Sequence, residues 1–359
     1  MEDEKDMRRL KIIELQNDII RQMTERNLRD VGEDLWGIRD TPPEGYPKVP
    51  DVFSRNKKNE SSKDTKDSSK KETEIPKENI EDLKKELNEY IGLDSVKKEV
   101  NSLINLVSIY KLRKEHSLPA EELSLHMVFT GNPGTGKTMV ARLMSRIYHS
   151  LGLLSKGHLL EVDRSGLVAG YVGQTAIKTQ EVISKALGGV LFIDEAYALT
   201  SRGPQDYGQE AVETLLKAME DNRDNLIVIV AGYTDLMEDF INSNPGLESR
   251  FNRFINFPDY SVDEMMDIFS LRMKKAGYEL SADAEDALRQ TIAEKSKDVT
   301  SFGNARGVRN LFERAVARQA DRLAAKQNIT REELMLLTKD DILETDVLKE
   351  TPQKESLDR

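Results

Sequence analysis

A lysine, two threonines and three glycines stand together in residues 131–138, Gly-Asn-Pro-Gly-Thr-Gly-Lys-Thr, close after the apolar run 127–129. Glycines let the backbone bend so that its N–H groups point inward at phosphate oxygens, and the helix expected next adds its positive N-terminal end. Lys137 is predicted to bind the β- and γ-phosphates, and the Thr138 hydroxyl to ligate Mg²⁺. The segment therefore predicts a P-loop that binds ATP through Asn132, Pro133, Gly134, Thr135, Gly136, Lys137 and Thr138.

Two carboxylates follow a second apolar run, Val-Leu-Phe-Ile at residues 190–193. A continuous apolar run of this length is typical of a buried central strand in a parallel sheet. The carboxyl ends of such strands are where open α/β sheets place their ligands. Asp194 is therefore predicted to hold Mg²⁺ together with Thr138, and Glu195 to polarise the water that attacks the nucleotide.

Arginines at two places could act on developing phosphate charge. Arg250, with Arg253 close behind, precedes the last predicted strand, on the flank of the fold, where it would serve a neighbouring subunit's nucleotide more easily than its own. Arg306 falls in the first turn of a helix for which Asn304 is a suitable N-cap. A cation there opposes the helix dipole, which fits either a functional residue or tolerance at an exposed site.

Two further segments leave alternatives open. Tyr171 lies between Gly170 and Gly173, and it is either a buried anchor or a presented aromatic that grips a chain through apolar contact. After the apolar run 226–232, Thr234 or Asp235 could lie between Lys137 and Glu195 and orient water. An ionised aspartate cannot donate a hydrogen bond, so neither residue is preferred.

From about residue 120 to 258 strands are predicted to alternate with helices, with strands at 126–130, 158–163, 189–194, 226–232 and 253–257. We expect an α/β fold: a P-loop αβα core with a mostly parallel sheet, followed by a small all-helical lid domain. Capping-box patterns at Ser261–Glu264 and Thr330–Glu333 indicate helix starts in the lid. Further helices are expected at about 283–296, 304–325 and 330–336.

The predicted organisation has five parts. Residues 1–37 carry an apolar helical stripe that fits a docking helix, a coiled-coil segment or a solvated helix. Residues 38–75 are predicted to be a disordered linker, since their Ser, Lys, Asp, Thr and Glu cannot bury enough apolar area. The nucleotide-binding core is expected at 76–258, the lid at 259–345 and a frayed tail at 346–359.

Composition narrows the classes of protein. The 359 residues include no cysteine and only four scattered histidines, so neither disulfides nor a thiolate metal site is expected. The net charge of −11 disfavours a large nucleic-acid footprint. No apolar stretch approaches the length of a membrane span, and the charged N-terminus lacks a secretory signal, so we expect a cytoplasmic protein without a membrane partner.

Together these residues resemble the AAA+ ATPases, and within them the CbbX/CfxQ group, which includes red-type Rubisco activases and stage V sporulation protein K. The resemblance covers about residues 78–345 and rests on segments 91–97, 131–138, 170–175, 192–197, 244–251 and 303–310. It implies that Ile91 and Gly92 line the adenine pocket and that Arg250 is an arginine finger. It also implies that Arg306 is the sensor 2 arginine. At sensor 1 the chain has Asp235 where many members carry Asn.

The resemblance further implies a homo-oligomer, expected to be a hexamer, in which Tyr171 pulls a polypeptide through the ring. The favoured reading is a ring-forming ATPase that couples ATP hydrolysis to remodelling of a protein partner. A nucleic-acid remodeller of the same fold is one alternative, and it would need a basic cluster beside Tyr171, where only Arg164 and Lys178 stand. A nucleotide-gated scaffold with little turnover is another, although a pure switch has no need of Glu195.

Overall fold

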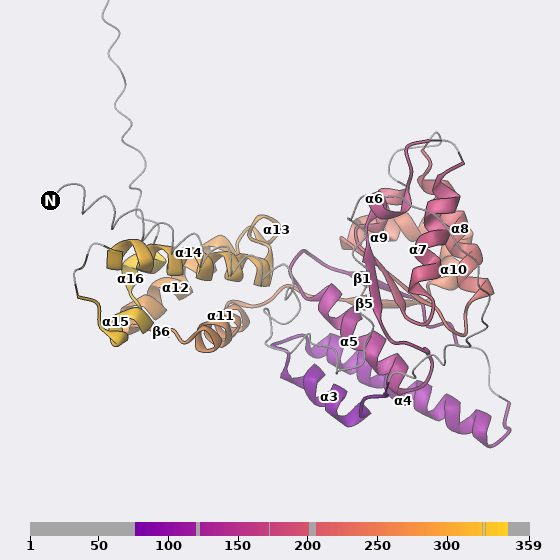
Figure 1. Ribbon diagram of the computed structural model, residues 1–359, viewed down its shortest axis with the longest axis horizontal. Coiled ribbons are helices and arrows are strands. Elements are labelled where there is room, and N and C mark those ends of the chain that lie inside the picture. The colour runs from indigo at the N-terminus through magenta and orange to yellow at the C-terminus, as the bar shows by residue number, and fades with distance from the viewer. Residues whose placement is uncertain are drawn as a thin grey trace, which may run out of the picture.

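The structure is a computed structural model that describes residues 76–119, 123–171, 173–200, 206–324, 326 and 328–343. The predicted segments 1–37, 38–75 and 346–359 lie outside the described residues. Two bodies follow each other along the chain: a layered α/β core and a smaller lid, drawn at opposite ends of the molecule (Figure 1). No helix in the described part of the chain is long and apolar enough to cross a membrane.

The core is built on one parallel sheet whose strand order is β2-β3-β4-β1-β5. Its strands are β1 Met127–Thr130, β2 Leu159–Val162, β3 Val190–Ile193, β4 Ile227–Gly232 and β5 Arg253–Asn256. All five predicted strands are confirmed, each to within one residue at either end. The three central strands are buried along their whole length, which explains their unbroken apolar runs.

Helices cover both faces of this sheet (Figure 1). Phe129, Phe192 and Ile229 pack on one face, in a cluster with α3 Ile80–Glu89, α4 Asp94–Glu115 and α5 Lys137–Ser150. The alternate residues Val128 and Leu191 pack on the other face. The elements over that face are α6 Arg164–Leu167, α7 Thr175–Ala186, η1 Ala196–Leu199, α8 Gly208–Asp221, α9 Thr234–Asn242 and α10 Pro245–Arg250. The alternation follows from the two-residue period of a strand.

The lid is helical and begins where the chain leaves β5. Its helices are α11 Val262–Ala276, α12 Ala282–Lys295, α13 Val299–Phe302, α14 Asn304–Ala324, α15 Arg331–Met335 and α16 Lys339–Ile342. Both predicted capping boxes are present, at the starts of α11 and α15. The α/β fold class is confirmed, and the lid contains in addition a short parallel pair, β6 Glu279–Leu280 with β7 Leu336–Leu337.

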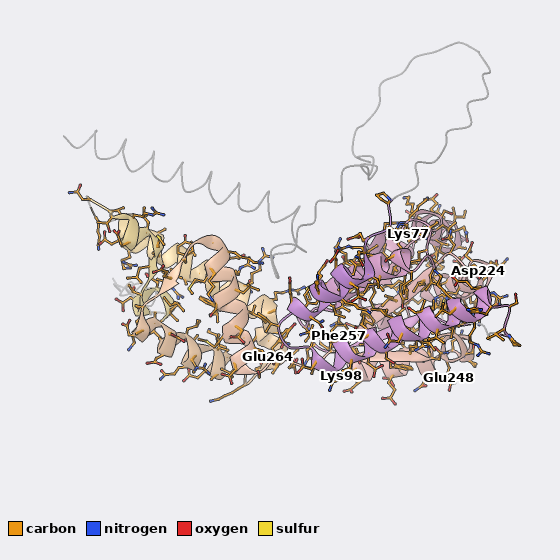
Figure 2. The ribbon with its side chains drawn as sticks, turned by 90° about the horizontal axis from the view of Figure 1, so that it is seen from below. Lys77, Lys98, Asp224, Glu248, Phe257 and Glu264 are labelled. Carbon is orange, nitrogen blue, oxygen red and sulfur yellow. The ribbon has the colours of Figure 1, made fainter. Side chains whose placement is uncertain are left out.

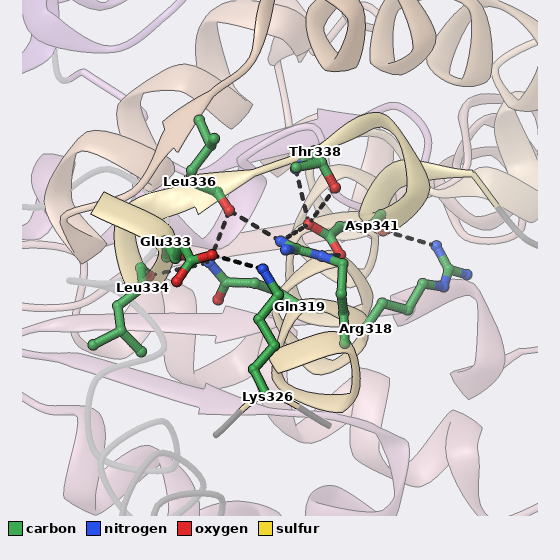
Figure 3. Close-up of polar contacts among 9 residues, drawn as sticks. Arg318, Gln319, Lys326, Glu333, Leu334, Leu336, Thr338 and Asp341 are labelled. Carbon is green, nitrogen blue, oxygen red and sulfur yellow. Dashed lines mark hydrogen bonds and ion pairs between the residues drawn. The ribbon is translucent and has the colours of Figure 1, made fainter. Parts of the chain in front are cut away.

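A polar network closes the far end of the lid (Figure 3). The fully buried Asp341 accepts from Arg322 Nη2 at 2.7 Å and from the Thr338 amide at 2.8 Å. Gln319 Nε2 donates to the carbonyls of Glu333, Leu334 and Leu336. Because these groups are buried and fully paired, they fix the chain's last described turns against α14.

Candidate nucleotide-binding site

A cleft of about 450 Å³ opens at the carboxyl ends of the strands, between the core and the start of α14. It contains the P-loop, both predicted carboxylates and one predicted arginine from the lid. The residues that line it are Gly131, Pro133, Gly134, Gly136, Lys137, Thr138, Met139, Arg142, Glu161, Asp194, Glu195, Gly232, Tyr233, Arg306 and Arg309. The fold thus brings together residues that lie up to about 180 positions apart in the chain.

The P-loop is held by close backbone contacts that only glycine permits at two positions. Gly131 has φ +140°, and a Cβ there would lie 2.3 Å from the Phe257 carbonyl oxygen. Gly134 has φ +74°, and a Cβ there would lie 2.1 Å from the Gly303 carbonyl oxygen. The loop is therefore shaped by the join between core and lid, where Figure 2 labels Phe257.

Lys137 begins α5 and points back over the loop. Its Nζ donates to the carbonyls of Gly131 at 2.8 Å and Asn132 at 2.9 Å. Burial lowers the pKa of Lys137, the Asp194 carboxylate opposes this shift, and the Arg306 guanidinium adds to it. A lysine held between opposing charges in a half-buried cleft is suited to receive an anion.

Oxygen atoms gather beside the lysine. Asp194 follows β3, and its Oδ1 accepts the backbone N–H of Glu195 at 3.0 Å. Glu195 has φ +49°, so the chain turns sharply there and both carboxylates line the cleft. With the Thr138 hydroxyl, Asp194 forms an all-oxygen donor pair, the ligand chemistry that Mg²⁺ prefers. Among the described residues no group of three or more His, Cys, Asp or Glu side chains could hold a metal. The phosphate oxygens of a nucleotide would complete such a site.

Sequence reasoning did not assign Glu161, Arg142, Tyr233 or Arg309, all of which line the cleft. Burial raises the pKa of Glu161, and Arg142 and the Thr138 hydroxyl lower it in part. A signal existed for the first two: Arg142 lies one helical turn after Thr138, and Glu161 is a charge inside the apolar strand β2.

The predicted sensor 1 residues lie elsewhere. Because β4 ends at Gly232, the next residue into the cleft is Tyr233, and Thr234 and Asp235 are exposed in the first turn of α9. Ile91 and Gly92 are also absent from the lining. Gly92 lies against Glu264 of the lid instead, since a Cβ there would meet Glu264 Oε1 at 2.1 Å. Figure 2 labels Glu264 beside this junction.

The two arginine groups separate. Arg306 and Arg309 line the cleft from α14, whereas Arg250 and Arg253 do not. Arg250 ends α10, with its Nη2 3.4 Å from Glu220 Oε2, and Arg253 Nε donates to the Ser124 carbonyl at 3.3 Å. Neither of these two residues is placed to reach a nucleotide held by the same chain.

Asn304 does not cap α14, which corrects the sequence prediction. Its φ is +52°, and its side chain is fully buried and bonded elsewhere. Asn304 Nδ2 donates to Asp259 Oδ1 at 2.8 Å and to the Pro133 carbonyl at 3.2 Å, while its Oδ1 accepts from the Tyr260 amide at 3.0 Å. A cap would have bonded the helix's own N–H groups.

Tyr171 is exposed, with 73% of its surface accessible. Cβ atoms built at Gly170 and Gly173 would meet nothing within 4 Å. Of the two roles left open by the sequence, a buried anchor is excluded and a presented aromatic fits. Ile177, 62% exposed at the start of α7, adds a second apolar side chain nearby in the sequence.

Similarity to known proteins agrees with this site. Residues 127–259 match the model of the ATPase family associated with various cellular activities (AAA), and residues 261–353 match the AAA lid domain. The chain belongs to the AAA ATPase family. It is 46% identical over 276 residues to protein CbbX of Cereibacter sphaeroides, with 76% of this chain and 88% of the relative covered.

Two other relatives extend the comparison. Stage V sporulation protein K of Bacillus subtilis is 41% identical over 266 residues, which cover 73% of this chain and 82% of the relative. The chloroplastic ribulose bisphosphate carboxylase/oxygenase activase of Cyanidioschyzon merolae is 44% identical over 278 residues, which cover 77% and 93%. The resemblance to this group is therefore confirmed, and this AAA ATPase binds and hydrolyses ATP.

Proposed function

We propose that this ATPase assembles into a hexameric ring and uses ATP hydrolysis to remodel a protein partner that Tyr171 grips. The observation that carries the proposal is the exposure of Tyr171 on a loop framed by two unobstructed glycines. An aromatic side chain that gives up so much apolar contact inside its own chain is available to another chain. Apolar gripping also needs no particular sequence in the partner.

The cleft supports a division of labour in ATP hydrolysis. Lys137 and the inward backbone N–H groups clamp the phosphates, and Arg306 adds positive charge from the lid. Thr138 and Asp194 would hold Mg²⁺, which when bound neutralises charge on the β- and γ-phosphates. Glu195 accepts a proton from, or orients, the attacking water. Tyr233 and Glu161 line the same cleft.

A short chain of contacts supports coupling between hydrolysis and grip. The 3₁₀ turn η1 begins directly after Glu195 and contains Ala198. Arg164 at the start of α6 donates from Nη1 to the Ala198 carbonyl at 2.7 Å and also pairs with Asp206. Helix α6 leads in turn to Tyr171. A movement of Glu195 can therefore be transmitted to Tyr171 through η1, Arg164 and α6.

The placement of Arg250 supports a ring. It does not line its own cleft, and its carboxylate partner Glu220 is 59% exposed. A half-exposed pair of this length is weak, so the guanidinium can exchange Glu220 for a phosphate on a neighbour. We propose that Arg250 completes the adjacent subunit's site as an arginine finger, with Arg253 close behind it on β5.

The nucleic-acid alternative is less well supported. The two basic residues near Tyr171 both bond their own chain: Arg164 as above, and Lys178 through Nζ to the carbonyls of Ser165 at 2.6 Å and Val168 at 3.1 Å. They are not free to pair with a phosphate backbone. The scaffold alternative leaves Glu195 without a purpose in the cleft.

The experiment that tests the function compares two variants. Glu195→Gln should trap the ATP-bound ring on its partner, and the trapped protein can be identified by pull-down. Tyr171→Ala on the same background should lose the partner while still forming rings with ATP. If Tyr171→Ala retains the partner as strongly as its parent, the gripping role is wrong.

A second arm tests the ring. Arg250→Ala should bind ATP but fail to hydrolyse it, and Lys137→Ala should fail to bind. Mixing these two proteins should restore part of the hydrolysis, because an intact cleft can then face an intact finger. No recovery in rings shown by light scattering to contain both variants would exclude a finger in trans.

We also propose that residues 76–258 and 259–345 are the working core and lid, and that the segment before Pro76 serves docking or targeting. A cytoplasmic location is proposed with it, from the charged and cysteine-free composition.

A further inference from the structure

Three consecutive P-loop carbonyls accept hydrogen bonds from the lid and from the segment that joins it to the core. The Pro133 carbonyl accepts from Asn304 Nδ2 at 3.2 Å, and the Gly134 carbonyl from the Ala305 amide at 3.2 Å. The Thr135 carbonyl accepts from the Tyr260 hydroxyl at 3.3 Å. These three hydrogen bonds therefore join three successive residues of the P-loop to the lid and to the segment before it.

The direction of these carbonyls fixes the direction of the neighbouring N–H groups. In a trans peptide the C=O of one residue and the N–H of the next point in opposite directions. With the carbonyls of Pro133, Gly134 and Thr135 bonded on the lid side, the N–H groups that follow each of them face away from those donors. Phosphate binding needs these N–H groups turned into the cleft. The lid therefore helps to impose the loop's phosphate-receiving shape.

Asn304 is the central member of this contact. It is fully buried at φ +52°, a conformation that asparagine tolerates better than most residues other than glycine. Its amide makes three hydrogen bonds: two donated, to Pro133 and Asp259, and one accepted, from Tyr260. A buried side chain whose oxygen and nitrogen are both hydrogen-bonded is costly to change, because each lost partner leaves another group unpaired.

Asp259 links the other end of the loop. Its carboxylate accepts from Asn132 Nδ2 at 2.9 and 3.0 Å and from Asn304 Nδ2 at 2.8 Å. Asp259 itself belongs to the segment that joins β5 to α11. One carboxylate thus ties the first residues of the P-loop to the start of α14, two residues before Arg306.

We propose that Asn304 and Asp259 are positioning residues that hold the P-loop open to phosphate and place Arg306 over it. The orientation of the lid and the affinity for nucleotide are then coupled, because a lid that rotates away removes the hydrogen-bond donors that shape the P-loop. This rests on the P-loop being the nucleotide site. Lys137→Ala tests that assumption separately, since it should abolish binding whether or not the lid contact matters.

The test uses the full chain and the binding of fluorescently labelled ADP without added metal. Asn304→Gly keeps the positive φ and removes the amide, and it should weaken binding about tenfold. Asn304→Asp should weaken it further, because a carboxylate would face Asp259 across a distance made for a hydrogen bond. Asn310→Ala, at an exposed position on the same helix, is the matched control and should bind as the parent does.

A charge exchange provides the rescue. In the double variant Asn304→Asp/Asp259→Asn, one amide again faces one carboxylate, so affinity should recover above that of Asn304→Asp alone. Recovery should be incomplete, because the Pro133 carbonyl still lacks its donor. A role in overall stability alone predicts instead that these variants lower the free energy of unfolding while the folded protein binds ADP with the parent's affinity.

Amide hydrogen exchange in the nucleotide-free protein gives a readout independent of binding. The amides of Ala305 and Tyr260 donate within this contact. The Tyr260 amide should exchange faster in Asn304→Gly, which lacks its acceptor, and the Ala305 amide should exchange faster in both Asn304 variants and slow again in the double variant. Should the Asn304 variants fail to fold, Asp259→Ala decides, because Asp259 is exposed and its loss removes both links. Unchanged ADP affinity and unchanged exchange in Asp259→Ala, or a double variant no better than Asn304→Asp, would overturn the proposal.

Discussion

Two glycine-rich loops of the core lead into helices, one directly after β1 and the other after β2 and α6, yet they meet opposite surroundings. In the P-loop, Cβ atoms at Gly131 and Gly134 would lie 2.3 and 2.1 Å from carbonyl oxygens of the core–lid join. In the loop that presents Tyr171, Cβ atoms at Gly170 and Gly173 would meet nothing within 4 Å. The first loop is shaped by its neighbours, and the second is left open to whatever approaches it.

The difference teaches how one fold divides two tasks. Phosphate binding needs hydrogen-bond donors that are fixed in advance. The backbone carbonyls of residues 131 to 135 all accept hydrogen bonds, and these bonds hold the shape of the P-loop. Gripping an extended chain needs an accessible aromatic more than a fixed one. Mutations should therefore separate the two loops, with nucleotide chemistry sensitive to shape and partner work sensitive to the side chain at Tyr171.

The largest effects are expected inside the cleft. Lys137→Ala should abolish nucleotide binding, because it removes the charge clamp beside the loop. Glu195→Gln should keep binding within a fewfold and slow hydrolysis by about 10²- to 10³-fold, since only water activation is lost. Nucleotide titration and steady-state phosphate release measure the two effects. Hydrolysis by Glu195→Gln at near the parent rate would remove Glu195 from this role.

Glycine substitutions compare the loops directly. Gly134→Ala should weaken ADP binding by about 100-fold, because the new Cβ must displace the Gly303 carbonyl and also sits at positive φ. Gly170→Ala has open space and should change neither ADP affinity nor the free energy of unfolding by more than about 0.5 kcal/mol. Equal effects of the two substitutions would remove the contrast between the loops.

How far the sequence predicts this molecule depends on how local each signal is. The three central strands were predictable because each is an apolar run, and the edge strands β2 and β5 were predictable from the alternation of strands with helices. Lys137, Thr138, Asp194 and Glu195 were predictable because a strand and the turn after it place them without help from distant segments. The structure brings all four of these residues to one cleft.

Long-range contacts escaped prediction. Asn304 reads locally as an N-cap, and its true partners Asp259 and Pro133 are 45 and 171 residues away. The end of β4 decides which side chain faces the cleft, so Tyr233 lines it while Thr234 and Asp235 begin α9, and one residue of register changes the answer. The two-residue strands β6 and β7 are too short to leave a periodic pattern.

Acid is expected to lower the free energy of unfolding by a smaller amount, through a histidine beside the strand that leads into the P-loop. His126 precedes β1, is buried, and accepts the Val228 amide through Nδ1 at 3.0 Å. Burial, helped by Arg250, lowers its pKa from 6.5 to about 4. His126 is therefore protonated below about pH 6.5 in the unfolded chain but only below about pH 4 in the folded chain. This part of the stability is complete above pH 6.5 and is lost as the pH falls, at up to about 1.4 kcal/mol per pH unit.

Denaturant unfolding at pH 7.5, 6 and 5 measures this loss. His126→Gln should be less stable than the parent at neutral pH. Because glutamine cannot be protonated, the stability of this variant should fall less steeply towards acid. His116→Gln, at an exposed position, should keep the parent's slope. If His126→Gln keeps that slope too, the buried imidazole does not supply it.

The smallest effect is expected from removing the N-terminal segment, provided the cut respects the support of the P-loop helix. Arg146 on α5 binds Glu78 through Nε at 2.8 Å and Nη2 at 2.6 Å, and Glu86 on α3 through Nη1 at 2.7 Å. A chain that begins at Pro76 keeps these bonds and should hydrolyse ATP within about twofold of the parent. A chain that begins at Ile80 loses Glu78 and leaves half of the Arg146 guanidinium unpaired. It should unfold about 1–3 kcal/mol more easily, because a half-buried charge has lost its partner.

Thermal unfolding and phosphate release on both truncated chains check this prediction. The Tyr171 loop serves as the internal comparison, since its only described ties are through α6 and α7, which neither cut touches. The two truncated chains should therefore show the same partner binding by the Glu195→Gln trap wherever they stay folded. Partner binding should be lost in both of them only if the segment before Pro76 itself docks the partner. Loss of hydrolysis in the chain that begins at Pro76 would show that the removed residues support the nucleotide site itself.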